Sequence, residues 1–179
     1  MLTRYKIGNS ILELSNGDIT VQSTEAIANA ANRRLSPGGG VSGAIHRTAG
    51  PQLWEECKKL GGCNTGESKL TRGYNLKAKY VIHTVGPVYS NSINDSEDLK
   101  DCYRNSLLLA SRKNIKSISF PSISTGIFGY PVKDASMIAL KTIVDFLKEH
   151  TEIELVRMIL FSKGDYNTYK SSLENILKD

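Results

Sequence analysis

Apolar residues follow two patterns that alternate along the chain. In the first pattern, short stretches of alternating or almost continuous apolar residues predict β-strands, because successive side chains of a strand point to opposite faces. These stretches lie at residues 10–14, 25–30, 67–72, 80–85, 117–120 and 155–161. The stretch at 80–85 (YVIHTV) is almost continuously apolar, which is typical of a strand buried inside a sheet.

In the second pattern, apolar residues recur every three or four positions and predict amphipathic helices. These segments lie at 41–49, 51–60, 99–113, 132–147 and 166–177. We expect the second to begin at Pro51 and to end before Gly61 and Gly62, and we expect the polar stretch 89–96 to form a loop. Because strands alternate with helices, the sequence predicts an α/β sandwich with helices on both faces of a largely parallel sheet.

The length and composition predict one globular domain that covers residues 1–179. Apolar residues make up 40% of the chain and charged residues 23%, so nothing in the composition indicates disorder. No apolar stretch is long enough to span a membrane, and the N-terminal residues lack the apolar core of a signal peptide. We therefore expect an intracellular, cytoplasmic monomer without membrane contact.

The formal net charge of +5 indicates an anionic partner. Lysine and arginine are scattered rather than clustered, so a small phosphorylated ligand fits at least as well as nucleic acid. The three cysteines, Cys57, Cys63 and Cys102, form no CxxC pair and have no histidine at metal-ligand spacing. We expect no disulfide, no bound metal and no cofactor.

A run of three glycines, Gly38 to Gly40, separates the apolar residues 26–31 from the helix expected to begin near Val41. Glycine tolerates positive φ angles and has no side chain, so the backbone of such a loop can approach a ligand closely. Its N–H groups, followed by the partly positive N-terminus of a helix, are suited to bind a phosphate or pyrophosphate. The alternative is a flexible surface turn without a ligand.

A second loop of similar character, residues 124–129 (STGIFG), joins the strand ending at Phe120 to the helix beginning near Val132. Ligands of α/β folds bind beyond the carboxyl ends of the strands, and both loops follow strands. Together they could hold a pyrophosphate from opposite sides, with Phe128 stacked on a sugar. In the alternative interpretation, Ile127 and Phe128 fill the core beneath an ordinary turn.

Three polar residues near these strands allow both a structural and a functional interpretation. Asp18 could cap a turn, or it could accept a hydrogen bond from an exocyclic amine. Asn32 could form a turn, or it could bind a sugar beside the first loop. His83 lies inside the stretch expected to be a buried strand, where a histidine is more often a hydrogen-bonded core residue than a catalyst.

Five motifs, in order along the chain, resemble the macro domain family and specifically its MacroD-type branch. They are GDIT (17–20), NAAN (29–32), GGGVSGAIHRTAG (38–50), HTVGP (83–87) and SISTGIFGYP (122–131). The resemblance implies a three-layer α/β/α fold with a central mixed, largely parallel sheet that binds ADP-ribose. Many members of the family remove ADP-ribose from acidic protein side chains or deacetylate O-acetyl-ADP-ribose.

The resemblance also implies which residues contact each part of ADP-ribose. Asp18 would accept the adenine amino group near the backbone of Ile19, Phe161 would line the adenine pocket, and Asn32 would hold the distal ribose. The diphosphate would lie between two groups of residues, with Phe128 also against the distal ribose. The first group is Gly38, Gly39, Gly40 and Val41, and the second is Ser124, Thr125, Gly126, Ile127 and Phe128. Asn32, Ser42 and Gly126 are the residues expected to contribute to catalysis.

The chain departs from the resemblance at Ser42, because MacroD-type hydrolases usually carry aspartate there and read GGGVDG instead of GGGVSG. In the family that aspartate is thought to orient or activate the attacking water. A serine hydroxyl cannot act as a general base near neutral pH without a partner. A Ser42–His46 pair could act as nucleophile and base, since His46 lies one helical turn further on. We do not expect this pair, because the family pattern already contains the histidine beside aspartate.

The sequence therefore leaves two functions open, both with ADP-ribose or a mono-ADP-ribosylated protein as the partner. In the first, the domain hydrolyses ester-linked mono-ADP-ribose or O-acetyl-ADP-ribose, and the ligand's own phosphate assists the attacking water. In the second, it is a reader that binds ADP-ribose without turnover. Ser42 could also be an engineered change, and binding of RNA or poly(ADP-ribose) is supported only by the basic pI of about 9.1.

Overall fold

The computed structural model describes residues 1–179 and contains one seven-stranded sheet with the strand order β1-β2-β7-β6-β3-β5-β4. The strands are β1 (Leu2–Ile7), β2 (Ser10–Asn16), β3 (Ala26–Ala30), β4 (Ser68–Arg72), β5 (Tyr80–Thr84), β6 (Ser117–Phe120) and β7 (Leu155–Leu160). The helices are α1 (Gly40–Ala49), α2 (Pro51–Cys57), α3 (Ile93–Arg112), α4 (Val132–Glu149) and α5 (Lys163–Lys178). The six predicted strands correspond to β2 through β7, and the five predicted helices to α1 through α5.

The interior of the sheet is parallel and its two edges are antiparallel. β2, β7, β6, β3 and β5 pair in parallel, whereas the edge strands β1 and β4 run antiparallel to β2 and β5. The prediction of a mixed, largely parallel sheet is therefore confirmed. One consequence is that the carboxyl ends of the parallel strands meet at the same edge of the sheet, which is where α/β folds bind ligands.

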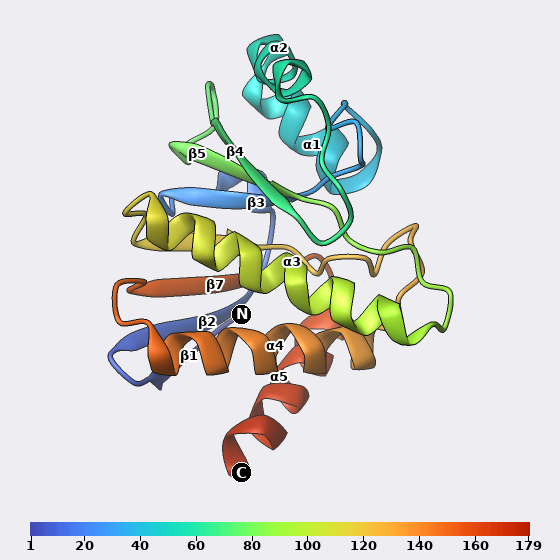
Figure 1. Cartoon of the computed structure of the whole chain (residues 1–179). Helices are drawn as coiled ribbons and strands as arrows, with labels where there is room; N and C mark the ends of the chain where they lie inside the picture. The colour runs from blue at the N-terminus through green and yellow to red at the C-terminus, as the bar shows by residue number, and fades with distance from the viewer.

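Helices cover both faces of the sheet and enclose two separate cores. α3, α4 and α5 pack on one face around a large core that includes Tyr103, Phe120 and Tyr169, and Figure 1 shows α3 and α4 side by side. α1 and α2 pack on the other face around a smaller core that includes Ile27 and Ile45. The predicted three-layer α/β/α architecture is confirmed. None of the helices combines the length and the apolar character that crossing a bilayer requires.

One strand was absent from the sequence-based prediction. β1 forms an antiparallel hairpin with β2, and Gly8 in the turn has a φ angle of +59°. The stretch LTRYKI does alternate, since Ile7 is buried while Leu2 and Arg4 are exposed. Arg4 forms an ion pair at 2.9 Å with Glu13 of β2 across the hairpin. The apolar pattern of β1 is weak, as is typical of an edge strand, because only one face of β1 packs against the core.

Helix boundaries also differ from the prediction, as at the start of α3 and the end of α2. α3 begins at Ile93, so the predicted loop 89–96 is wrong for its last four residues. Ser92 and Asp95 form a capping box that starts the helix, but Ile93 is 83% exposed and its first turn shows no amphipathic pattern. The predicted helix 51–60 ends earlier, because α2 stops at Cys57 and a 3₁₀ turn covers Lys58–Leu60.

Candidate functional site

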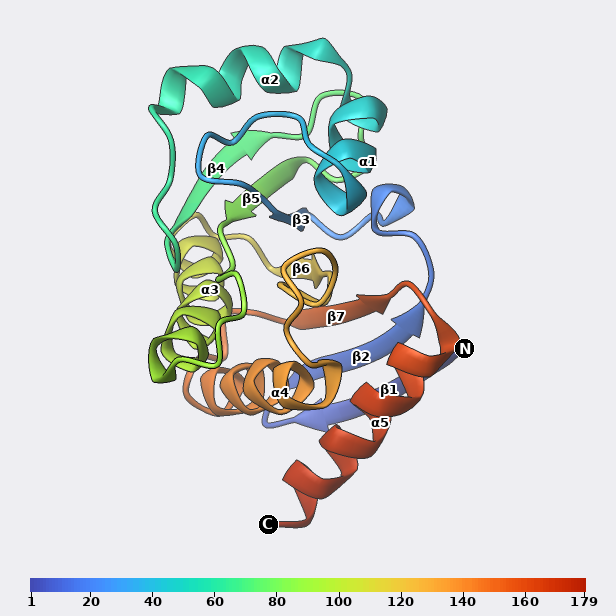
Figure 2. The ribbon, with the colours of Figure 1, turned by 90° about the vertical axis from the view of Figure 1, so that its right-hand side faces the viewer.

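The residues predicted to bind a ligand lie where parallel strands end. Asp18 follows β2, Asn32 follows β3, the loop 122–131 follows β6, and Phe161 follows β7. Because these strands are parallel neighbours in one sheet, residues far apart in the sequence meet at the same edge. The loop after β6 lies near the middle of Figure 2, between β7 and the part of the molecule that carries α1.

Asn32 organises the first loop through its side-chain amide. Its Oδ1 accepts hydrogen bonds from the N–H groups of Arg34 and Ser36, both at 3.1 Å, and its Nδ2 donates to the carbonyl of Ser36 at 2.9 Å. Leu35 lies inside this turn with a φ angle of +58° and is fully buried. The left-handed conformation costs about 1–3 kcal/mol, and burial of the leucine side chain offsets it by about 1.5–3 kcal/mol.

The glycine run forms the start of α1. The helix begins at Gly40 with Gly39 as its N-cap, one residue earlier than predicted. The N–H groups of residues 38–42 have no acceptor within the chain. A Cβ atom at Gly43 would lie 2.3 Å from the carbonyl oxygen of Gly38, so the loop folds directly onto a glycine of the helix. This geometry gives a row of free N–H groups at the positive end of a helix, as an anion site requires.

The second loop also leaves its backbone N–H groups free. The hydroxyl of Ser124 donates to the carbonyl of Pro87 at 2.8 Å, and the hydroxyl of Thr125 donates to the carbonyl of Ser122 at 3.1 Å. Both hydroxyls thus hold the loop together. The N–H groups of residues 124–128 have no acceptor within the chain. The N–H groups, rather than the hydroxyls, are therefore available for an anion.

The two hydrophobic residues of this loop behave differently from each other. Ile127 is 100% exposed, so the interpretation that it fills the core is wrong. Phe128 is half-buried and lines a cleft of about 510 Å³ together with Asn32.

A close contact sets the position of the second loop, because a Cβ atom at Gly86 would lie 2.2 Å from the Ser124 hydroxyl. Only glycine fits there, which lets the segment after β5 pack against the loop after β6.

Asp18 does cap a turn, as the structural interpretation predicted. Its Oδ1 accepts hydrogen bonds from the N–H and the hydroxyl of Thr20 at 2.8 and 2.7 Å, at the start of the 3₁₀ turn Ile19–Val21. Its Oδ2 has no partner within the chain, and neither has the N–H of Ile19. Phe161 is 93% exposed and is joined to this corner by a hydrogen bond from Asn16 to its carbonyl. The corner thus offers an acceptor, a donor and an exposed ring.

Ser42 is buried in the first turn of α1 and has no base beside it. Its hydroxyl is 3.5 Å from the carbonyl of Ser36, which is a weak contact at best. Both ring nitrogens of His46 are buried without a hydrogen-bond partner, so the two side chains form no Ser–His pair. Burial lowers the pKa of His46. Ser42 therefore has no group that could activate its hydroxyl as a nucleophile.

His83 is a hydrogen-bonded core residue, as predicted. Its Nδ1 accepts from the amide of Asn29 at 3.1 Å, and its Nε2 is 2.8 Å from the hydroxyl of Thr71. Burial, with a smaller contribution from His46, lowers the pKa of His83 to about 3. The imidazole is neutral at physiological pH and joins β3, β4 and β5 beneath the cleft.

Comparisons with known proteins agree with this arrangement. Residues 28–139 match the model of the family described as Macro domain. The chain belongs to the macro domain family. It is 50% identical over 165 residues to human ADP-ribose glycohydrolase MACROD2, and this match covers 90% of the chain but only 39% of the human protein. The family membership inferred from the sequence motifs is confirmed.

Solved macro domains have the same fold. The Oceanobacillus iheyensis macrodomain with ADP superposes with a TM-score of 0.97 at 42% identity, covering 99% of this chain and 97% of that one. The Trypanosoma brucei macrodomain in complex with ADP-ribose superposes with a TM-score of 0.86 at 45% identity, covering 89% and 68%. The parallel strands whose carboxyl ends carry the candidate site are thus part of the family architecture.

The cleft of this macro domain contains residues that the sequence analysis missed. Arg33, Thr65, Asp95 and Asp98 line it, besides the predicted Asn32 and Phe128. They come from the segment after β3, the segment before β4 and the first turns of α3. The Ser-x-x-Asp pattern at residues 92–95 could have revealed the start of α3, and hence that Asp95 lies near a helix terminus.

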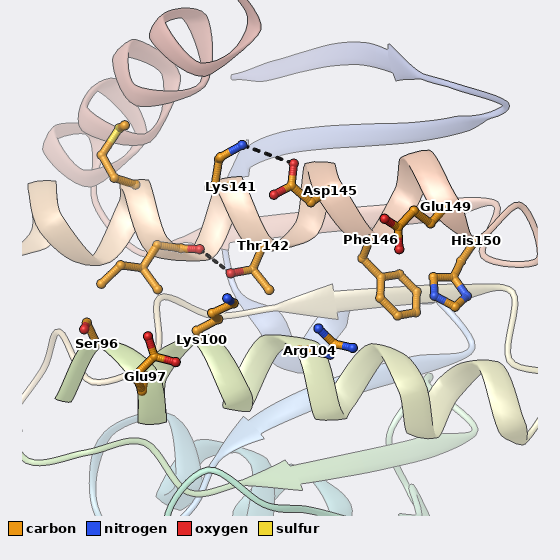
Figure 3. A pocket seen from close by; sticks show the side chains of 12 residues that line it. Ser96, Glu97, Lys100, Arg104, Lys141, Thr142, Asp145, Phe146, Glu149 and His150 are labelled. Atoms are coloured by element: carbon orange, nitrogen blue, oxygen red, sulfur yellow. Dashed lines mark hydrogen bonds and ion pairs between the residues drawn. The ribbon is translucent and has the colours of Figure 1, made fainter. Parts of the chain in front are cut away.

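A second and larger hollow shares no lining residue with the cleft. A groove of about 670 Å³ runs between α3 and α4 and is lined by charged side chains of both signs, among them Lys100, Arg104, Lys141 and Asp145 (Figure 3). None of the predicted site residues lines it. The groove is larger than the cleft, but none of the N–H groups of the two loops, residues 38–42 and 124–128, faces it, because neither loop contributes a lining residue.

Proposed function

We propose that this macro domain binds ADP-ribose and hydrolyses ester-linked mono-ADP-ribose on acidic protein side chains, and also O-acetyl-ADP-ribose. The observation that carries the proposal is the pair of loops, residues 38–42 and 124–128, whose N–H groups lack acceptors at one edge of the sheet. A diphosphate carries two negative charges and accepts many hydrogen bonds, so it suits two rows of donors. The names of the human and trypanosomal relatives, an ADP-ribose glycohydrolase and a macrodomain in complex with ADP-ribose, support the choice of ligand.

The adenine would lie at the corner formed by Asp18, Ile19 and Phe161. The free Oδ2 of Asp18 would accept a hydrogen bond from the exocyclic amine, and the free N–H of Ile19 would donate to the neighbouring ring nitrogen. The exposed ring of Phe161 would cover one face of the base. These three groups match the donor, acceptor and apolar face of adenine.

The distal ribose would lie in the cleft between Asn32 and Phe128. Nδ2 of Asn32 donates one hydrogen bond to Ser36 and keeps a second hydrogen for a ribose hydroxyl. Phe128 lines the same cleft and offers an aromatic face to the sugar. The diphosphate between the two loops and the ribose in the cleft together give the ligand one orientation.

Catalysis would rest on positioning rather than on a protein base. Ser42 has no partner that could make it basic, so the water would be held by the ligand's own phosphate while the loops fix the ribose. Water would break the ester bond and release ADP-ribose and the free carboxylate of the protein. Loss of a positioned base typically slows such a step by about 10²- to 10⁴-fold.

The same observation at Ser42 favours a second candidate, a reader that binds ADP-ribose without hydrolysis. A buried serine with neither a base nor a carboxylate beside it contributes to binding geometry alone. Both candidates require tight binding of free ADP-ribose, so an affinity measurement does not separate them.

A time course of ADP-ribose release separates them. The substrate is a protein mono-ADP-ribosylated on glutamate or aspartate, and the enzymes are the chain itself and Ser42→Asp. We expect slow release by the chain and release about 10²- to 10⁴-fold faster by Ser42→Asp. If the chain binds ADP-ribose but releases none over a time in which Ser42→Asp completes the reaction, it is a reader.

A further inference from the structure

The cleft beside the proposed ribose site continues beyond the residues expected to contact ADP-ribose. Its volume is about 510 Å³, and its far wall is built from Arg33, Thr65, the segment 85–88 and the first turns of α3. Val88 also lines the cleft and exposes its side chain to solvent, and Ile127, the neighbour of the lining residue Phe128, is exposed as well. An apolar rim over a polar wall is suited to a polypeptide better than to a second phosphate group.

The charge of the far wall argues against an anionic occupant. Asp95 and Asp98 both line it. Asp95 is committed to the start of α3, since its carboxylate accepts the N–H groups of Ser90 and Ser92 at 2.7 and 3.2 Å, and these bonds hold its pKa below the usual range. Two carboxylates repel a diphosphate, so this wall faces the other end of the ligand.

Asp98 carries the negative charge of this wall that is free to bind, since Asp95 is already held by the start of α3. Its side chain is half-buried, accepts no hydrogen bond within the chain and takes part in none of its ion pairs. The one cation of the wall, Arg33, donates from Nε and Nη2 to the hydroxyl of Thr65 at 3.3 and 3.2 Å, and forms no ion pair with Asp98. An unpaired carboxylate in a cleft attracts a cation from the molecule that enters it.

We infer that this cleft receives the polypeptide that carries the ADP-ribose, and that Asp98 selects segments with a lysine or arginine next to the modified side chain. The inference rests on the proposed function, because the polypeptide is attached to the distal ribose, and that ribose occupies the end of the cleft at Asn32 and Phe128. Asp98 acts here as a specificity residue and takes no part in the hydrolysis.

The test measures binding, so that it is independent of turnover. Two peptides of identical length carry ADP-ribose through a non-hydrolysable linkage, one with lysine and one with glutamine on either side of the modified position. Calorimetry gives their Kd values for the chain, for Asp98→Asn and for the matched control Glu97→Gln. Glu97 is the preceding residue of α3, but it lines the groove between α3 and α4 instead of the cleft.

We expect the chain to bind the lysine peptide about two- to five-fold tighter than the glutamine peptide, the range of an exposed ion pair. Asp98→Asn should bring this ratio close to one, Glu97→Gln should keep it, and added salt should reduce it. Free ADP-ribose should bind all three proteins equally.

Three results overturn the inference. They are equal affinity of the chain for both peptides, a ratio unchanged in Asp98→Asn, and a loss in Asp98→Asn that is equally large for free ADP-ribose. A chain that binds the peptides with the expected ratio but releases no ADP-ribose from an ester-linked substrate disproves the hydrolase proposal alone. Failure to bind free ADP-ribose disproves both.

Discussion

The cleft at the edge of the sheet and the groove between α3 and α4 are hollows of comparable size with opposite construction. The groove, about 670 Å³, is walled by mostly polar and charged side chains of two helices, and Lys141 is paired with Asp145 at 3.3 Å. The cleft, about 510 Å³, adjoins two loops whose N–H groups have no acceptor. If volume were the criterion for a binding site, the groove would be selected instead of the cleft.

The difference shows that unpaired polar groups are a better guide to a binding site than volume. Backbone N–H groups that find no acceptor cost about 1–3 kcal/mol each when they are buried, so a chain keeps them together only where a ligand or water satisfies them. In the groove, exposed lysine, arginine and carboxylate side chains are solvated and gain little from a ligand. We therefore expect charge changes at the two loops and at the Asp18 corner to affect the binding of ADP-ribose strongly, and identical changes in the groove to leave it unchanged.

Gly126→Glu should have the largest effect. Gly126 is exposed, and a Cβ atom there meets nothing within 4 Å, so the variant should fold normally. Its carboxylate would lie beside the proposed diphosphate, where juxtaposed like charges cost several kcal/mol, and affinity for ADP-ribose should fall by about 100-fold or more. Calorimetry gives the affinity and thermal unfolding checks the fold. Met137→Glu in the groove makes the same charge change and should bind normally; normal binding by Gly126→Glu would mean that the two loops do not hold the diphosphate.

Asp18→Asn should have the next largest effect. Asparagine keeps an oxygen that can accept the hydrogen bonds from Thr20, so the turn is retained, while the free Oδ2 and its charge are lost. Affinity for ADP-ribose should fall by about 1.5–3 kcal/mol, the usual contribution of a hydrogen bond to a charged group. Calorimetry measures the loss, with Asp145→Asn in the groove as the charge-matched control. Unchanged affinity would remove Asp18 from the adenine site.

Acid should weaken the fold beneath the cleft. The pKa of His83 is lowered from 6.5 to about 3 by burial and by His46, so the unfolded chain binds a proton that the folded chain does not. Stability is therefore full above pH 6.5 and is lost progressively as the pH falls towards 3. At pH 5 the free energy of unfolding should be about 2 kcal/mol lower than at pH 7. Urea unfolding at both pH values measures this difference, which should shrink in His83→Gln; an equal difference in that variant would assign the effect to other groups.

The sequence predicts the parts of the site that depend on local chemistry. The glycines at 38–40 and the turn residues of 124–129 mark both loops, because free N–H groups and tight turns need those residues in sequence. Asp18 and Asn32 are found because each follows a strand. Their hydrogen bonds to Thr20 and Ser36 show that each also builds the turn that presents it.

The far wall of the cleft could not be predicted in this way. Arg33, Thr65 and Asp98 are brought together by the pairing of β3 and β4 with β5 and by the packing of α3, and nothing local in the sequence connects them. The same holds for the exposure of Ile127, since an apolar residue in a turn is buried or exposed according to what packs over it. Long-range topology, rather than residue type, decides these positions.

Lys141→Ala tests the groove itself and should have the smallest effect. The variant removes an exposed ion pair with Asp145 four residues along α4, and such pairs contribute about 0.3–0.5 kcal/mol to stability. In urea unfolding, the free energy of unfolding should fall by no more than this amount, because the higher helix propensity of alanine offsets part of the loss. Affinity for ADP-ribose should remain unchanged in calorimetry, because no residue of either loop lines the groove. A clear loss of affinity would show that the groove communicates with the cleft, and the contrast between the two hollows would then have to be abandoned.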